Sequence, residues 1–87
     1  MISYVASKGA VIAMKLFAAR EFGSDGIRVN CIAPGLTMSG GVMADNSWEN
    51  ALPAIVSRRC IKRHEEPEDL VGAVYFLLSA DSDFVTG

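Results

Sequence analysis

The spacing of apolar and polar positions divides the chain into two helices, a short strand and an irregular segment. Residues 4–22 contain no proline, and apolar side chains recur at helical spacing on more than one side. One stripe comprises Val5, Ala13, Leu16 and Phe17, and a second comprises Ala6, Ala10 and Met14. A helix that is apolar on most sides is expected to be covered on most sides. We therefore predict that helix 4–22 packs on a sheet and on a second subunit.

A strand is predicted directly after this helix, which Gly23 is expected to end with a left-handed cap. The alternating faces of residues 26–33 are Ile27, Val29, Cys31 and Ala33 on one side, and Arg28, Asn30 and Ile32 on the other. Such alternation is typical of a short strand, and Pro34-Gly35 ends it. In open parallel sheets, ligands bind beyond the carboxyl ends of strands, where Pro34-Gly35 is expected to lie.

The stretch 36–62 follows no single period, and we interpret it as a lid. Gly40 and Gly41 are hinge candidates, and residues 48–61 have helix-compatible spacing that Pro53 either starts or interrupts. Because no strong helix pattern anchors the segment before Trp48, we expect residues 36–56 to be the most mobile part of the chain.

The last helix is predicted to start at Pro67, a favoured first position, with Glu68 and Asp69 complementing the helix dipole. Its apolar face comprises Leu70, Val71, Val74, Leu77 and Leu78.

Composition narrows the class of protein. The 87 residues are 51% apolar, which is high for a short soluble chain and suggests surfaces that something else covers. A net charge of −2 with scattered basic residues argues against a nucleic-acid partner. Cys31 and Cys60 are far apart, so we expect reduced thiols and neither a disulfide framework nor a metal site. No apolar run reaches membrane-spanning length, and we expect a cytoplasmic protein without membrane contact.

Tyr4 and Lys8 are the first candidates for chemistry. Four residues apart on a helix, they lie on one face. A nearby ammonium favours the phenolate and is expected to lower the pKa of the tyrosine from about 10. Such a phenol can give or take a proton at a carbonyl or alcohol oxygen. The pair occurs by chance on many surface helices, and its context decides its meaning.

That context resembles the short-chain dehydrogenase/reductase family. The matching motifs, in order, are Tyr4-x-x-x-Lys8, Gly26-Ile27-Arg28-Val29-Asn30-Cys31-Ile32-Ala33-Pro34-Gly35, Pro67-Glu68-Asp69-Leu70 and Phe84-Val85-Thr86-Gly87. They cover nearly the whole chain and are similar to the C-terminal portion of the family.

The resemblance implies an α/β fold, the C-terminal fragment of a Rossmann-like doubly wound parallel sheet in the order helix–strand–lid–helix. Residues 1–87 would form the C-terminal part of one such domain. The glycine-rich phosphate loop, an Asn-Asn-Ala-Gly segment and the catalytic serine of the family would precede Met1.

The activity implied by the resemblance is hydride transfer between NAD or NADP and a small carbonyl or secondary alcohol substrate. Tyr4 would be the acid or base, assisted by Lys8, which would also bind the nicotinamide ribose. Backbone groups around Pro34, Gly35 and Thr37, with the hydroxyl of Thr37 or Ser39, would hold the carboxamide. The family also implies a homo-oligomer, a dimer or tetramer.

Other polar residues have simpler interpretations. Ser3 is adjacent to Tyr4 and is expected to be a solvated or capping serine, and His64 is expected to be a surface side chain. The family usually has glycine where Glu65 stands, which puts a tight turn in doubt. Glu66 is a poorer N-cap than Ser or Thr.

Two interpretations follow from the sequence. The first is a catalytic dehydrogenase/reductase of which these residues are a part, although they alone are expected to be inactive. The second is a non-catalytic truncated remnant that self-associates through its apolar helix faces.

Overall fold

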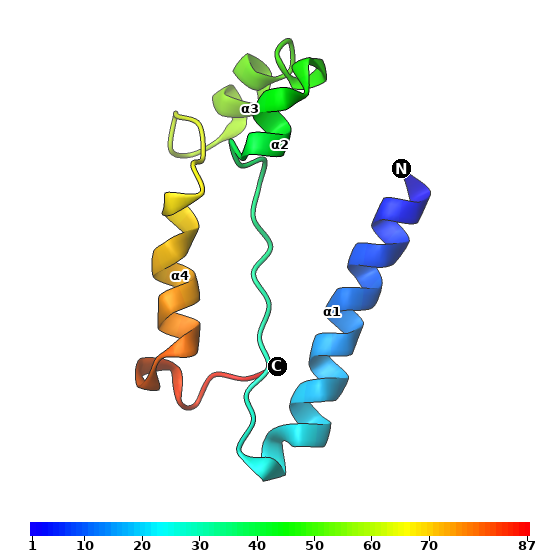
Figure 1. The fold of residues 1–87 in the computed structure, drawn as a ribbon, viewed down its shortest axis with the longest axis vertical. Helices are drawn as coiled ribbons and strands as arrows, with labels where there is room; N and C mark the ends of the chain where they lie inside the picture. Colours follow the sequence, from blue (N-terminus) through cyan, green and yellow to red (C-terminus); the bar gives the residue numbers. More distant parts are fainter. The chain divides into compact units, whose positions relative to one another are not determined.

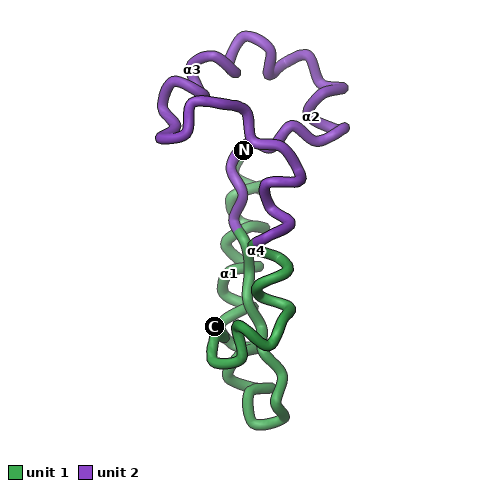
Figure 2. Tube along the Cα trace, turned by 90° about the vertical axis from the view of Figure 1, so that its left-hand side faces the viewer, with its two compact units in different colours: residues 1–32, 73–87 green, residues 33–72 purple.

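The computed structural model describes residues 1–87, and every regular element in it is helical (Figure 1). The α-helices are α1 (Ile2–Phe22), α2 (Gly40–Ala44), α3 (Leu52–Arg58) and α4 (Glu68–Leu78). Single 3₁₀ turns η1, η2 and η3 lie at Gly23–Asp25, Asn46–Trp48 and Ala80–Ser82. The chain divides into two compact units, residues 1–32 with 73–87, and residues 33–72 (Figure 2).

The predicted fold class is wrong for this structure. We expected a fragment of a Rossmann-like doubly wound parallel sheet with a strand over 26–33, but no strand forms and residues 27–35 belong to no regular element. A strand needs a neighbour that satisfies its backbone N–H and C=O groups, and no segment of the chain supplies a ladder. The one pairing of this type is an isolated parallel bridge between Thr37 and Glu65.

Helix α1 confirms the predicted helix and begins two residues earlier than expected. Its predicted left-handed cap at Gly23 is wrong, because Gly23 has a right-handed helical conformation with φ of −61°. One further turn, η1, follows, and the left-handed residue is Gly26 with φ of 77°. The N–H of Gly26 donates to the carbonyl of Gly23, so the chain reverses at a residue without a Cβ.

In the second unit, the stretch 36–62 contains short helices, and α3 lies within the part that has helix-compatible spacing, 48–61. Ser39 caps α2 by accepting a hydrogen bond from the N–H of Val42, and Asp45 caps η2 by accepting one from Ser47. Pro53 lies in the first turn of α3, so it starts that helix and does not interrupt it. Helix α4 begins at Glu68, one residue after the expected Pro67.

Arg28 organises the first unit around the end of α4. Its guanidinium donates to the carbonyls of Leu77, Ser79, Ser82 and Val85 over 2.8–3.3 Å, and also to the hydroxyl of Ser82. The last turn of a helix leaves its carbonyls unpaired, and the guanidinium satisfies that of Leu77 in α4 as well as carbonyls of the residues that follow the helix. Ser82 is fully buried in this cluster.

The C-terminal residues continue this contact along Val29. The N–H of Val29 donates to the hydroxyl of Thr86 over 3.0 Å, and the N–H of Gly87 donates to the carbonyl of Val29 over 2.9 Å. Lys15 of α1 donates to the carbonyl of Gly87 over 2.7 Å. These polar contacts, more than apolar packing, hold residues 28–30 to the C-terminal segment.

The hydrophobic core is minimal. Ala19 is the only buried apolar residue, while Phe17 is 70% exposed and Leu78 is 81% exposed. A chain of this size buries a modest share of its surface in any case, and here little apolar area leaves water. Helical hydrogen bonds and the Arg28 cluster therefore carry much of the observed structure.

Helix α1 with η1, Ile2–Asp25, is the one helix long and apolar enough to cross a membrane, judged by length and composition alone. The mean hydropathy of an 18-residue window is 1.3, with 6% of the window buried. By this measure the expectation that nothing reaches membrane-spanning length is wrong. Core helices of soluble proteins satisfy the same criteria, so the finding supports no membrane assignment.

Candidate functional site

Tyr4 and Lys8 lie side by side on α1, as their spacing predicts. The Nζ of Lys8 is 5.6 Å from the centroid of the Tyr4 ring, so the ammonium lies over the face of the ring. Both side chains are exposed, and Tyr4 retains 62% of its accessible surface. The helix thus exposes a phenol and an ammonium side by side to solvent.

The polar ends of this pair have no partner within the chain. Neither the phenol oxygen of Tyr4 nor the Nζ of Lys8 takes part in a hydrogen bond or an ion pair, while Ser7 donates to the carbonyl of Tyr4 over 2.8 Å. Ser3, expected to cap or to be solvated, is exposed and makes no capping hydrogen bond. The phenol and the ammonium are therefore free to hydrogen-bond a ligand.

The second group of candidates lies in the second unit, where the extended chain meets α2. The hydroxyl of Thr37 donates to the carbonyl of Gly35 over 3.2 Å, and that of Ser39 accepts from the N–H of Val42 over 3.4 Å. Pro34 and Gly35 are exposed, and Thr37 is half-buried. Both hydroxyls therefore already have one partner in the chain.

These two hydroxyls still offer what a carboxamide needs. Thr37 uses its proton on Gly35 and keeps oxygen lone pairs that can accept from an amide N–H. Ser39 accepts from Val42 and keeps an O–H that can donate to an amide carbonyl. The chemistry of the residues present fits the carboxamide of a nicotinamide.

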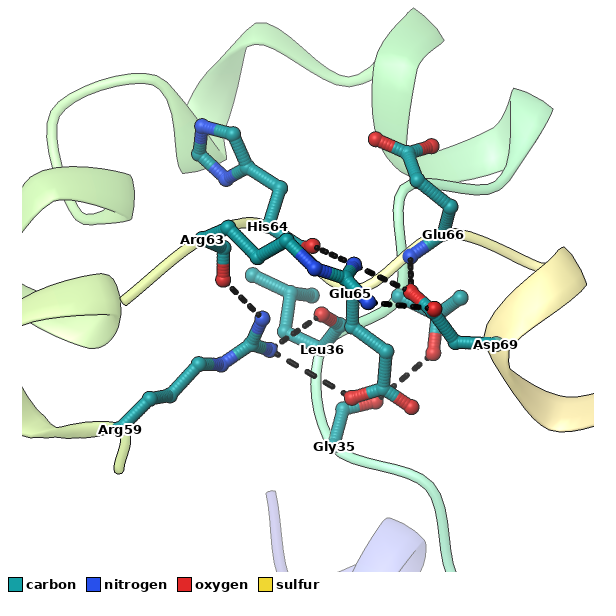
Figure 3. A network of polar contacts seen from close by, with 9 residues as sticks. Gly35, Leu36, Arg59, Arg63, His64, Glu65, Glu66 and Asp69 are labelled. Carbon is teal, nitrogen blue, oxygen red and sulfur yellow. Dashed lines mark hydrogen bonds and ion pairs between the residues drawn. The ribbon is translucent and has the colours of Figure 1, made fainter. Parts of the chain in front are cut away.

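A polar network that the sequence did not reveal fixes the start of this segment (Figure 3). Arg59 donates to the carbonyl of Leu36 over 2.6 Å and lies 3.6 Å from the carboxylate of Glu65. The carbonyl of Glu65 accepts from the N–H of Met38 over 2.7 Å. The only sequence signal for this network is a dense basic and acidic stretch at 58–69, and spacing alone does not pair it.

That stretch also corrects the description of the basic residues as scattered. Four of the chain's eight Lys and Arg residues fall within residues 58–63. Two of them face carboxylates: Arg59 faces Glu65, and Arg63 faces Asp69. The positive charge of this stretch is largely balanced by the acidic residues that follow it.

Asp69 closes the network at the start of α4. Arg63 donates to both of its carboxylate oxygens over 2.6 Å, and the N–H of Glu66 donates to it over 2.8 Å. These hydrogen bonds, that from Arg63 first, hold the pKa of Asp69 well below its usual value. The hydrogen bond to Asp69 and the charge on its carboxylate also raise the pKa of Arg63.

His64 is exposed, as expected, and borders two hollows of the second unit. One has a volume of about 440 Å³ and is lined by Arg59, Ile61, Arg63, His64, Glu65 and Asp69. The other, of about 570 Å³, is lined by Glu49, Leu52, Pro53, Val56, Ser57, Lys62 and His64. Neither hollow contains a residue that the sequence singled out for cofactor binding.

Comparison with known proteins assigns the chain to a family. Residues 1–87 match the family described as Enoyl-(Acyl carrier protein) reductase over their whole length. The chain belongs to the short-chain dehydrogenase/reductase family. The predicted resemblance is thereby confirmed.

Individual members of the short-chain dehydrogenase/reductase family are similar to the chain over its whole or nearly whole length. It is 38% identical to the inactive 2-(S)-hydroxypropyl-CoM dehydrogenase 2 of Xanthobacter autotrophicus, covering 100% of the chain and 40% of that protein. It is 40% identical to 3alpha-hydroxysteroid dehydrogenase of Mediterraneibacter gnavus, in an alignment that covers 97% of the chain and 33% of that protein. It is 37% identical to 3-oxoacyl-[acyl-carrier-protein] reductase FabG of Staphylococcus epidermidis, in an alignment that covers 98% of the chain and 34% of that protein. The chain spans 40% or less of the length of each of these relatives.

The structure explains how the chain accommodates Glu65 and Glu66, the two departures from the short-chain dehydrogenase/reductase pattern. Glu65 forms its turn without a positive φ, so glycine is not required there. The N–H of Glu66 is satisfied by Asp69 three residues later, as in the second half of a capping box. The helix start therefore does not depend on the side chain of Glu66.

Proposed function

We propose that the chain is part of an oxidoreductase that transfers a hydride between NAD or NADP and a carbonyl or secondary alcohol. One observation carries the proposal. In a chain that matches the family over residues 1–87, Tyr4 and Lys8 lie together with their polar ends free. The dehydrogenase and reductase activities named for several relatives support the same class of reaction.

Tyr4 is the proposed acid or base. Its phenol O–H gives a proton to the substrate oxygen during carbonyl reduction and takes it back during alcohol oxidation. Lys8 stabilises negative charge on the phenol oxygen through its own positive charge. Its three N–H donors also suit the hydroxyls of a ribose.

The nicotinamide supplies or accepts the hydride when it is bound. Thr37 and Ser39 are the proposed partners of its carboxamide, since one offers a free acceptor and the other a free donor. Pro34 and Gly35 are exposed beside them and complete the proposed cofactor loop. The proposed partners are a small-molecule substrate and further copies of the chain, with neither nucleic acid nor membrane involved, in the cytoplasm.

The test is Tyr4→Phe in the protein expressed from the full reading frame that encodes this chain. Removing the hydroxyl removes the proton donor, and kcat for carbonyl reduction should fall about 10²- to 10⁴-fold. Tyr75→Phe is the matched control, because Tyr75 is 73% exposed on α4 and has no proposed role. Near wild-type kcat in Tyr4→Phe would show that another group transfers the proton.

The near absence of buried apolar side chains favours a second candidate function. Ala19 is the only buried one, so the chain presents apolar surface that another copy can cover. In this interpretation the chain is a non-catalytic remnant that self-associates. The reading frame upstream of Met1 distinguishes the two: an in-frame glycine-rich phosphate loop supports the enzyme, and a stop codon supports the remnant.

A further inference from the structure

Arg59 is largely buried and hydrogen-bonded, although it lies next to a short surface helix. It directly follows α3, and its N–H donates to the carbonyl of Val56, closing the last turn of that helix. Its guanidinium turns away from α3 and donates to the carbonyl of Leu36 over 2.6 Å and to that of Arg63 over 3.1 Å (Figure 3). Glu65 lies 3.6 Å away on the same side.

The side chain is held by the protein more than by water. Only 21% of the Arg59 side chain and 22% of the Glu65 side chain are exposed. The preceding residue, Arg58, is exposed and makes no hydrogen bond or ion pair through its side chain. Because an arginine loses considerable side-chain freedom when it is fixed, two carbonyl acceptors and a carboxylate indicate a defined structural role.

The contacts of this arginine converge on the loop between Gly35 and Ser39. Leu36, whose carbonyl Arg59 binds, is the second residue of the loop. The carboxylate of Glu65 faces Arg59, while the backbone carbonyl of Glu65 accepts from the N–H of Met38 over 2.7 Å and its backbone forms the isolated bridge with Thr37. The loop has no regular secondary structure of its own. Hydrogen bonds to Arg59 and Glu65 hold its backbone in place.

The approach is close enough to restrict the loop sterically. A Cβ placed on Gly35 would lie 3.0 Å from the Oε2 of Glu65 and 3.5 Å from the Nη2 of Arg59. The ion pair thus packs directly against the loop backbone. If Arg59 moves, we expect the backbone of residues 35–38 to move with it.

We propose that Arg59 is a positioning residue for residues 35–39 of the cofactor loop, and that it sets the affinity of the enzyme for its nicotinamide cofactor. The proposal rests on the proposed function, in which Thr37 and Ser39 hold the carboxamide. Arg59 does not touch the cofactor in this role. Its planar fork fixes two carbonyls at once, which a single lysine ammonium cannot reproduce with the same geometry.

The same residue connects the loop to the C-terminal end of α3. The hydrogen bond from Arg59 to Leu36 joins residues 23 positions apart, and α2, η2 and α3 lie between them. A displacement of the C-terminal end of α3 moves the group that holds Leu36.

The first measurement uses the protein from the full reading frame and needs no cofactor. Arg59→Met should accelerate amide hydrogen exchange at Met38, whose N–H bonds to Glu65, about tenfold. Arg58→Met is the matched control and should leave that exchange rate unchanged. Arg59→Lys keeps the charge, loses the fork, and should give an intermediate rate.

The second measurement is equilibrium binding of NADH and NADPH to the protein from the full reading frame. Arg59→Met should weaken binding of the preferred cofactor about tenfold, the size expected for losing a charge-assisted hydrogen bond. Arg59→Lys should weaken it less, and Arg58→Met should not change it. The substrate KM at saturating cofactor should stay within about twofold of wild type, since Arg59 acts through the cofactor loop.

The outcomes separate this inference from the proposed function. Unchanged Met38 exchange and unchanged cofactor affinity in Arg59→Met would overturn the role of Arg59, even if Tyr4→Phe abolishes activity. Weakened affinity and faster exchange in Arg59→Met would support that role, even if Tyr4→Phe proves active and the acid–base assignment fails. If Arg59→Met does not fold, Arg59→Lys and Glu65→Gln provide the same comparison with smaller perturbations.

Discussion

Asp69 illustrates how one side chain can determine where a helix starts. It accepts two hydrogen bonds from Arg63 and one from the N–H of Glu66. A carboxylate in the first turn also interacts favourably with the helix dipole. The start of α4 therefore depends on a charged acceptor at position 69 more than on the preceding Pro67.

This dependence predicts a stability that varies with pH. The pKa of Asp69 in the folded chain lies below the value of about 3.9 in an unfolded one. Its contribution is therefore present above about pH 4 and is lost as the pH falls through the lowered pKa. Asp69→Asn should lower the urea midpoint, followed by circular dichroism, at neutral pH, and the difference from wild type should shrink on acidification.

Glu68→Gln is the control for this experiment. Glu68 lies in the same first turn, but its carboxylate makes no hydrogen bond or ion pair in the chain. Its substitution should shift the midpoint less at neutral pH. An Asp69→Asn chain as stable as wild type at neutral pH would contradict the role of the carboxylate.

At the scale of the elements, helices were predictable and the strand was not. Helical spacing depends on local contacts within one segment, which is why α1 and α4 fall within two residues of their predicted starts. Alternation in 26–33 reports only that one face differs from the other. Pairing requires a neighbouring strand, and the structure contains none, so the same pattern forms no ladder.

The candidate site also contains one feature that local sequence predicts and one that it does not. The juxtaposition of Tyr4 and Lys8 follows from helix geometry and was therefore predictable from spacing. The fixation of Leu36 by Arg59 joins residues 23 positions apart and depends on the path of the chain between them. Neither composition nor periodicity contains that information.

Two glycines in helices give a prediction about elements. A Cβ on Gly9 of α1 or on Gly72 of α4 would meet no atom within 4 Å. Gly9→Ala and Gly72→Ala should each raise the free energy of unfolding by about 0.5–1 kcal/mol, because alanine favours a helix more than glycine does. Chemical unfolding followed by circular dichroism measures the change.

Gly26→Ala is the opposite control. Its φ of 77° places it in the left-handed region, where a Cβ costs about 1–2 kcal/mol. That substitution should lower stability although open space surrounds it. A stabilising Gly26→Ala would mean that the turn after η1 is not held in this conformation.

At the scale of the whole molecule, exposed apolar surface is the dominant property. Large exposed side chains include Ile2, Val5, Met14, Phe17, Met43, Ile61, Val71, Tyr75, Leu78 and Phe84. Extensive exposed apolar surface usually marks contact with other chains. Helix α1 contributes it on several sides, as its sequence pattern predicts.

We predict that the isolated 87 residues self-associate and do not bind dinucleotide. Association should depend on α1, so Phe17→Glu should reduce it more than Phe84→Glu, although both residues are highly exposed. Dinucleotide binding needs a phosphate loop at a helix N-terminus, and no Gly-x-Gly loop occurs in the chain. Light scattering during an NADH titration measures both properties.

A monodisperse folded monomer would contradict the first half of this prediction. Micromolar NADH affinity of the isolated chain would contradict the second. Equal effects of Phe17→Glu and Phe84→Glu would indicate association through general apolar surface, without a special role for α1.

Arg28 imposes an order of events during synthesis. The acceptors of its guanidinium lie 49 to 57 residues further along the chain, at positions 77–85. While the ribosome makes the residues between, α1 can fold locally, but Arg28 has only water to bind. The first unit therefore closes only after residues 77–85 have emerged, and until then Arg28 lacks the acceptors that hold it in the finished chain.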